Sequence, residues 1–172
     1  MPIIETNKET NKETDKEMNE NLMRHTCDLA TENISLGGGP FGCIITDSNY
    51  NIISTGTNRV TIENDPTLHA EIVAIKNACK KIDNFNLSDY HLYTSCEPCP
   101  MCLSAIYWSR IKNVYYGNTR KDAANIDFDD SFIYDEINKP INERAIKMTH
   151  IADDYAKNSF KKWKEYEKRI EY

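Results

Sequence analysis

The sequence lacks any apolar run long enough to cross a membrane. No segment approaches the roughly 20 consecutive apolar residues that a bilayer span needs, and the N-terminal region has no apolar core of the signal-peptide kind. Positive charge is also scarce, since 21 Lys and Arg stand against 27 Asp and Glu, a net charge of −6. This balance argues against a nucleic-acid partner, which needs clustered basic side chains. We therefore expect a cytoplasmic protein that acts on a small molecule and has no membrane partner.

Cysteine and histidine are few, with six and four residues. Six cysteines could form three disulfides, but no export signal is visible and Cys96, Cys99 and Cys102 stand close together. This spacing is more typical of a metal site in a reducing compartment than of a disulfide framework.

The chain is long enough for one domain, at 172 residues. It begins with a biased stretch, "NKETNKETDKEMNEN", that is polar and nearly free of apolar side chains. Such a stretch cannot offset its ordering entropy by burial. We predict a polar low-complexity tail over residues 1–17 and a single folded domain over 18–172.

Strands and helices alternate along the rest of the chain. We predict a helix from about Met18 that ends before the "GGGP" of 37–40, and a hairpin of two strands follows it. The strands are expected at 41–47, 52–58, 91–95, 113–117 and near 147–152, and the helices at 68–82, 99–109, within 118–138, and at the C-terminus with Phe160, Trp163, Glu167 and Ile170 on one side. This order predicts an α/β fold, a three-layer α-β-α sandwich with a central mixed five-stranded sheet.

The cysteine run has three interpretations. An iron–sulfur site uses similar spacing but needs a fourth cysteine, and no cysteine follows Cys102. A structural zinc would be closed by four protein ligands, with Cys96 among them. A catalytic zinc would have three protein ligands and a water molecule in the fourth position.

Local geometry favours the catalytic site. Pro100 suits the first position of a helix, so Cys99 is expected at its N-cap and Cys102 one turn later on the same face. Free N–H groups at the helix start favour thiolate forms of both residues. Cys96 ends the preceding strand, so we expect it to point elsewhere and to pack as a small residue.

His69 is the preferred third ligand because Glu71 follows it near a helix start, in "NDPTLHAEIVAI". In the middle of a helix, side chains two positions apart point in different directions. If the helix begins near Leu68 rather than at Asp65, His69 can project from its end and Glu71 can reach a water molecule on the metal. Together the two segments form the H-x-E…P-C-x-x-C signature of zinc deaminases. We predict one Zn²⁺ per chain.

The sequence also resembles the cytidine-deaminase superfamily and, within it, the bacterial-type guanine deaminases. The resemblance runs from about Gly38 to Tyr172. It rests on "GGPFG" (38–42), "NDPTLHAE" (64–71), "YTSCEPCPMCLSAIYW" (93–108), "FDDSFIYDEINKP" (128–140) and the final "EY". It implies a cytidine deaminase-like fold and hydrolysis of guanine to xanthine and ammonia, in which zinc-bound hydroxide attacks C2 and Glu71 shuttles the proton.

The resemblance also implies a set of substrate contacts. Asn58 would bind the purine edge, the Ala70 N–H would face the ligand, Asp130 would meet N1 and N2 and carry a second proton, and Tyr172 would close the pocket. The family is similar in forming homodimers, so the C-terminal segments are expected to exchange between subunits. Arg59 departs from the neutral residue expected after the binding Asn, which leaves the ligand open.

Four alternatives to guanine therefore stay open. The chain could act on guanosine, on cytosine or on tRNA adenosine, although the acidic charge weakens the last of these. It could instead be a non-catalytic zinc-stabilised binding module, in which Cys96 would close the metal site.

Overall fold

The computed structural model describes residues 4–151 and 154–172, with side chains from residue 12 onward. The chain divides into two compact units, Met1–Asp130 and Ser131–Tyr172. Each unit is described by itself. The expected division into a tail and one domain at residue 18 stays a prediction.

The first unit is built on a mixed sheet of four strands in the order β2-β1-β3-β4. β1 is antiparallel to both β2 and β3, whereas β4 is parallel to β3. The predicted hairpin and the mixed sheet are therefore confirmed. The strands are β1 (Gly42–Thr46), β2 (Ile52–Thr57), β3 (His91–Cys96) and β4 (Asn113–Asn118).

The prediction of a fifth strand near 147–152 is wrong. Residues 147–151 form no strand, and residue 152 lies outside the described residues. The apolar side chains of Ile146 and Met148 are two positions apart, as in a strand, but both are exposed, and so is Ile151. An alternating pattern becomes a strand only when a neighbour pairs with its backbone, and nothing local in the sequence specifies that neighbour.

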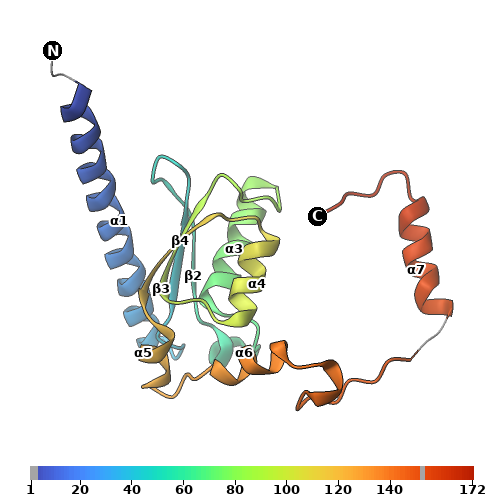
Figure 1. Cartoon of the computed structure of the whole chain (residues 1–172). Helices are drawn as coiled ribbons and strands as arrows, with labels where there is room; N and C mark the ends of the chain where they lie inside the picture. Colours follow the sequence, from blue (N-terminus) through green and yellow to red (C-terminus); the bar gives the residue numbers. More distant parts are fainter. Residues whose placement is uncertain (1–3, 152–153) are drawn as a thin grey trace. The chain divides into compact units, whose positions relative to one another are not determined.

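Helices cover both faces of the sheet, as the three-layer prediction required (Figure 1). α1 packs on one face against β1 and β3, and α3 packs on the other face against β2 and β1, beside α4. The helices of the first unit are α1 (Ile4–Ser35), α2 (Val60–Glu63), α3 (Ala70–Ile82), α4 (Pro100–Trp108) and α5 (Arg120–Ala124).

α1 is much longer than the sequence indicated. It begins at Ile4 instead of Met18, yet it is too polar to cross a membrane, and no described helix is both long and apolar enough to do so. Two tyrosines, Tyr50 in the turn between β1 and β2 and Tyr93 of β3, form hydrogen bonds with it. The Tyr50 hydroxyl donates to Asp15 at 2.8 Å and the Tyr93 hydroxyl to Asn19 at 2.5 Å. These bonds hold polar residues of the N-terminal repeat region on the sheet.

Side chains of the central strands alternate between two cores. Cys43 and Ile45 of β1 and Leu92 of β3 belong to the core under α3 and α4. Ile44 and Tyr93, the intervening residues, belong to the core under α1. Because successive side chains of a strand point to opposite faces, one short apolar run supplies both layers.

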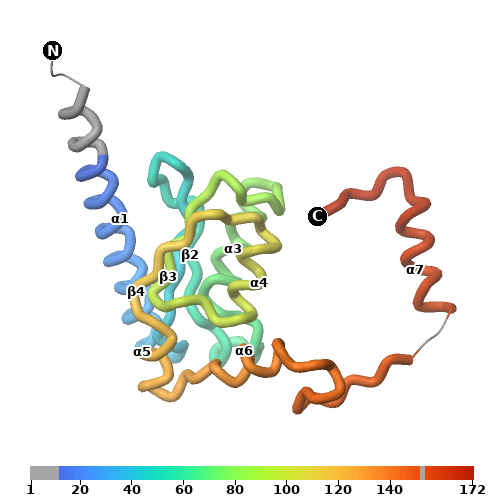
Figure 2. The backbone as a smooth tube through the Cα atoms, in the orientation of Figure 1, coloured from blue at the N-terminus to red at the C-terminus, as the bar shows by residue number. Residues whose placement is uncertain are grey.

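The second unit contains α6 (Ser131–Asn138), a 3-10 helix (Ile141–Glu143) and α7 (Asp154–Glu165). Figure 2 traces its path through these elements to the C-terminus. The expected C-terminal helix exists, but it ends before Glu167 and Ile170, so these two residues are not on its face. Arg144 braces the turn after α6 by donating to the Ile137 and Lys139 carbonyls, each at 3.1 Å.

Gly56 sets how closely α3 approaches the sheet. A Cβ atom at this position would overlap the Ala70 carbonyl oxygen and lie 2.5 Å from the Ala74 amide nitrogen. Both contacts are backbone atoms of α3, which cannot rotate away. The start of α3 therefore lies against β2 only because residue 56 has no side chain.

We predict that Gly56→Ala lowers the free energy of unfolding by about 1–3 kcal/mol, since overpacking of this size forces backbone shifts. Urea denaturation measures this change. Thr55→Ala is the control, because Thr55 is exposed on the same strand. Equal losses in the two variants would contradict the close-approach argument.

Candidate functional site

Two helices begin side by side, and each begins with a predicted metal ligand. His69 is the N-cap of α3 (φ −70, ψ 158) and Cys99 is the N-cap of α4 (φ −65, ψ 168). Pro100 occupies the first turn of α4, as predicted. Asp65 forms a turn instead of starting α3, because its carboxylate accepts the Thr67 N–H at 2.8 Å. The expected late start of the helix is confirmed.

The three proposed ligand atoms have the spacing that zinc requires. The His69 Nδ1 atom lies 3.5 Å from Cys99 Sγ and 3.6 Å from Cys102 Sγ, and all three ligand atoms lie within 4.8 Å of one another. Tetrahedral Zn–S and Zn–N bonds of ordinary length place a sulfur and a nitrogen about 3.6 Å apart. The two sulfurs and the imidazole therefore fit one zinc ion.

The cluster also favours the anionic ligand that zinc needs. A hydrogen bond from Cys102, reinforced by the His69 ring, lowers the pKa of Cys99 to about 4. The nearby Cys99 sulfur in turn raises the pKa of His69. Since the thiolate is the form that binds a metal, Cys99 is prepared for this role.

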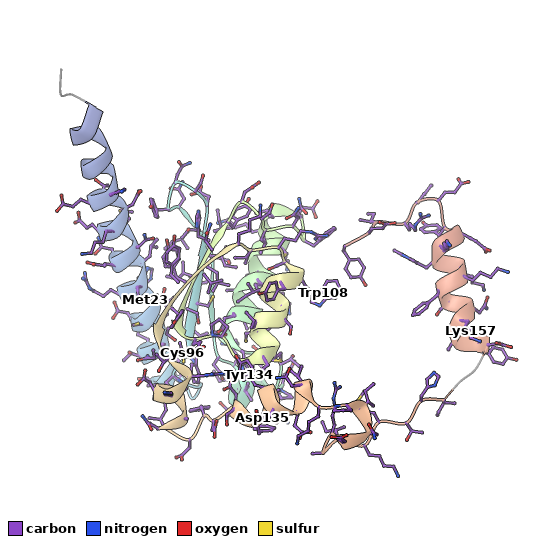
Figure 3. The ribbon with its side chains drawn as sticks, viewed as in Figure 1. Met23, Cys96, Trp108, Tyr134, Asp135 and Lys157 are labelled. Atoms are coloured by element: carbon purple, nitrogen blue, oxygen red, sulfur yellow. The ribbon has the colours of Figure 1, made fainter. Side chains whose placement is uncertain are left out.

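Cys96 differs from its two neighbours. Its sulfur contacts the Thr119 carbonyl oxygen at 3.6 Å, and burial raises the pKa of its thiol to about 11. Figure 3 shows it at the end of β3, close to α5. Among the described residues the ligand group contains only His69, Cys99 and Cys102. A four-ligand site closed by Cys96 is therefore not what the geometry favours.

Glu71 points into the protein beside the ligand cluster. Only 6% of it is exposed. One carboxylate oxygen accepts the Thr94 hydroxyl at 3.1 Å, and the other accepts the Cys102 thiol at 3.3 Å. Burial raises the pKa of this carboxyl. A solvated helix-surface glutamate is thus excluded, and the group can take up and release protons beside the metal.

A cavity of about 380 Å³ opens beside these groups. Its aromatic wall consists of Phe41 and Phe128, whose rings meet edge to face at 5.0 Å. The lining residues include His69 and Cys99 of the ligand group, Glu71 beside them, and the Asn58 carboxamide. The wall also carries one arginine, Arg120, and four further acidic side chains: Glu97, Asp127, Asp129 and Asp130. Its size and its mixed lining suit a small heterocycle with several polar edges.

Two of the predicted substrate contacts line this cavity. Asn58 is buried, and its side-chain oxygen accepts the Val60 N–H at 3.3 Å. Asp130 lies on the far wall, where burial raises the pKa of its carboxyl. Arg59 forms an ion pair with Glu63 and is not among the lining residues, so it does not change the pocket's charge directly.

The other two predicted contacts do not line it. Ala70 is fully buried at the start of α3 and is not among the lining residues. Tyr172 belongs to the second unit and is 72% exposed. Both assignments stay predictions.

Several site residues were not found from the sequence. Thr94 could have been predicted from the sequence. It lies two positions after Leu92 in β3, so both side chains point to the face of the sheet that α3 covers. Glu97 lies within the quoted cysteine segment but was given no role, and Arg120 lies in no motif. Only the fold brings them together, through the bond from the Arg120 main-chain N–H to the Glu97 carboxylate at 3.1 Å.

Comparison with known proteins supports the same site. Residues 16–118 match the zinc-binding region of cytidine and deoxycytidylate deaminases. Guanine deaminase of Bacillus subtilis is 46% identical over 155 residues, which cover 90% of this chain and 99% of the relative. The crystal structure of a Bacillus subtilis guanine deaminase superposes with a TM-score of 0.86 at 47% identity, over 89% of this chain and 98% of that one.

A more distant relative shares the metal-binding part. The tRNA-specific adenosine deaminase of Haemophilus influenzae is 42% identical over 99 residues, 58% of this chain and 57% of the relative. The family match spans more than half of the chain, and a near-full-length relative exceeds 40% identity. The chain therefore belongs to the cytidine and deoxycytidylate deaminase family and contains its zinc-binding domain.

Proposed function

We propose that this protein is a zinc-dependent guanine deaminase, which hydrolyses guanine to xanthine and ammonia. The observation that carries the proposal is the extent of its similarity to the Bacillus subtilis enzyme. An alignment over 155 residues extends into the second unit, since the first unit ends at Asp130. The similarity to the tRNA adenosine deaminase covers only 99 residues. Guanine is therefore preferred to other amino-heterocycles.

His69, Cys99 and Cys102 hold the metal in this proposal. A zinc ion held there would supply Lewis acidity and would lower the pKa of a coordinated water molecule to about 7. Glu71 accepts a proton from the attacking water, transfers it to a ring nitrogen and later protonates the departing amine. A C–O bond forms at C2, the exocyclic C–N bond breaks, and ammonia leaves. Proton transfer of this kind typically contributes ~10²–10⁴ in rate.

The remaining assignments concern the base. Asn58 binds the purine edge, the Ala70 N–H donates to the ligand, and Asp130 accepts from N1–H and N2–H and assists with the second proton. Tyr172 closes the pocket. Each of these contacts matters because an unpaired buried polar group costs about 1–3 kcal/mol.

The alternatives are less well supported. The four acidic residues of the cavity wall would repel an RNA backbone, and Arg120 is the only lysine or arginine among its lining residues. Guanosine and cytosine are not excluded by charge, so they belong in the same assay. A non-catalytic module requires a closed metal site, whereas the ligand cluster borders an open cavity.

We also propose a cytoplasmic homodimer with exchanged C-terminal segments. All six cysteines are free thiols, which suits a reducing compartment. The second unit leaves many large apolar side chains exposed, among them Phe132, Ile137, Phe160, Trp163 and Ile170. A partner subunit would remove this surface from water.

The function is tested by incubating the purified zinc-loaded protein with guanine, guanosine, cytosine and adenine and measuring ammonia. We expect release from guanine and a xanthine product. Zinc near one per chain without ammonia from any of the four would contradict the enzymatic proposal.

Replacing the proton carrier should separate metal binding from turnover. Glu71→Gln keeps the size and the Thr94 contact but cannot accept a proton. We expect about one zinc per chain and a kcat lowered by at least ~10². Thr67→Ala, outside the cavity lining, serves as the control. Substantial residual turnover in Glu71→Gln would argue against its role.

The two classes of cysteine should behave differently. Cys99→Ser removes a ligand thiolate, so the zinc content should fall well below one per chain, and activity with it. Cys96→Ser should retain the metal, because its sulfur lies outside the ligand group. Elemental analysis after dialysis measures both. Equal zinc loss in the two variants would favour the closed four-ligand site.

The C-terminal proposal is tested by deleting Tyr172. We expect a higher KM or a lower kcat for guanine with unchanged zinc and an unchanged dimer mass in light scattering. The matched control is Tyr166→Ala, an exposed tyrosine beyond α7. If the truncated chain turns over guanine as the full chain does, Tyr172 does not close the pocket.

A further inference from the structure

Asn33 lies in the last turn of α1 and is 1% exposed. Its side-chain amide donates two hydrogen bonds across a gap between chain segments. One goes to the Gly39 carbonyl oxygen at 2.8 Å and the other to the Asn58 carbonyl oxygen at 2.7 Å. Gly39 and Asn58 both line the cavity, whereas Asn33 does not. A single buried amide outside the cavity lining therefore connects two residues of the cavity wall.

The amide is tightly packed on the side of Gly38. A Cβ atom at Gly38 would overlap both the Asn33 amide nitrogen and the Asn58 carbonyl oxygen. The other side of the amide makes no compensating bond, since Asn33 Oδ1 is buried without a partner among the described residues. An unsatisfied buried acceptor is normally avoided. Here the unpaired oxygen belongs to an amide whose NH₂ group makes two short hydrogen bonds, which requires a group with two N–H donors.

The two bonds also fix what surrounds the Asn58 carboxamide. Gly39 lies so close that a Cβ atom there would sit 3.1 Å from Asn58 Cγ and Oδ1. On the other side, the Asn58 side-chain oxygen accepts the Val60 N–H at 3.3 Å. Movement of either carbonyl would therefore shift the carboxamide relative to the metal ligands and Glu71.

We propose that Asn33 is a positioning residue that holds Asn58 and the Gly39 wall in the geometry needed to bind the purine edge. This inference rests on the proposed guanine deaminase function. Asn33 lies outside the cavity lining and plays no part in proton transfer. Because the Asn58 contact is present in both the bound substrate and the transition state, its loss should raise KM and leave kcat nearly unchanged.

The test is Asn33→Asp, which keeps the volume but replaces the amide donor with an acceptor. We expect the KM for guanine to rise at least about tenfold, with kcat within about threefold and zinc content unchanged. In the Glu71→Gln background, where turnover is blocked, the Kd of guanine measured by calorimetry should rise by the same factor. An unchanged KM and Kd in a folded variant would overturn the proposal.

Thr26→Val is the matched control. Thr26 is also buried on α1, but its hydroxyl donates within the helix to the Leu22 carbonyl at 2.8 Å. We expect this variant to lose stability without a change in KM. An equal rise in KM would show that general loosening of α1 explains the effect, which would also overturn the proposal.

A wild-type measurement covers the case in which Asn33→Asp does not fold. In ¹⁵N-labelled protein, the side-chain amide protons of Asn33 should exchange with solvent much more slowly than those of the exposed Asn84. Exchange at the same rate would overturn the two-bond clamp. Absence of guanine turnover in the wild-type protein would instead refute the proposed function, while the exchange rates would still decide whether the clamp exists.

Discussion

The site depends on the convergence of two helix starts on one metal. α3 supplies His69 at its N-cap and Glu71 in its first turn, and α4 supplies Cys99 and Cys102 in the same way. A helix start leaves backbone N–H groups free and favours nearby negative charge, so both positions suit a thiolate or a developing anion. The convergence depends in turn on Gly56, which allows α3 to lie directly against β2.

Glu71 is buried where the two helix starts meet, and this burial raises the pKa of its carboxyl. A carboxylate beside a metal must be able to hold a proton for part of the cycle, and burial makes the protonated form easier to reach. The Thr94 hydroxyl donates a hydrogen bond to one of its oxygens. In the proposed mechanism, the same helix start thus provides a metal ligand on one residue and a proton carrier two residues later.

The chain has the family's zinc-binding region, and further residues of the chain form the cavity beside it. The acidic wall and the Phe41–Phe128 pair favour a small uncharged ring over a phosphate-rich polymer. Trp108, the last residue of α4, is 65% exposed (Figure 3). Together with the apolar side chains of the second unit, this exposure is consistent with the proposed homodimer.

The sequence by itself determined the features that depend on neighbouring residues. Pro100 after Cys99 specified a helix start, Asp65 delayed α3 until His69 reached its cap, and the apolar alternation of β1 and β3 specified strands. Only the tertiary structure decided which distant segments meet. Residues 147–151 were expected to form a strand but pair with none of the described strands. Asn33 bonds to the carbonyls of Gly39 and of Asn58, which lies 25 positions later in the sequence. Backbone pairing and buried hydrogen bonds of this kind are not encoded in any local periodicity, because the same side chain makes them only when the fold brings its partner within reach.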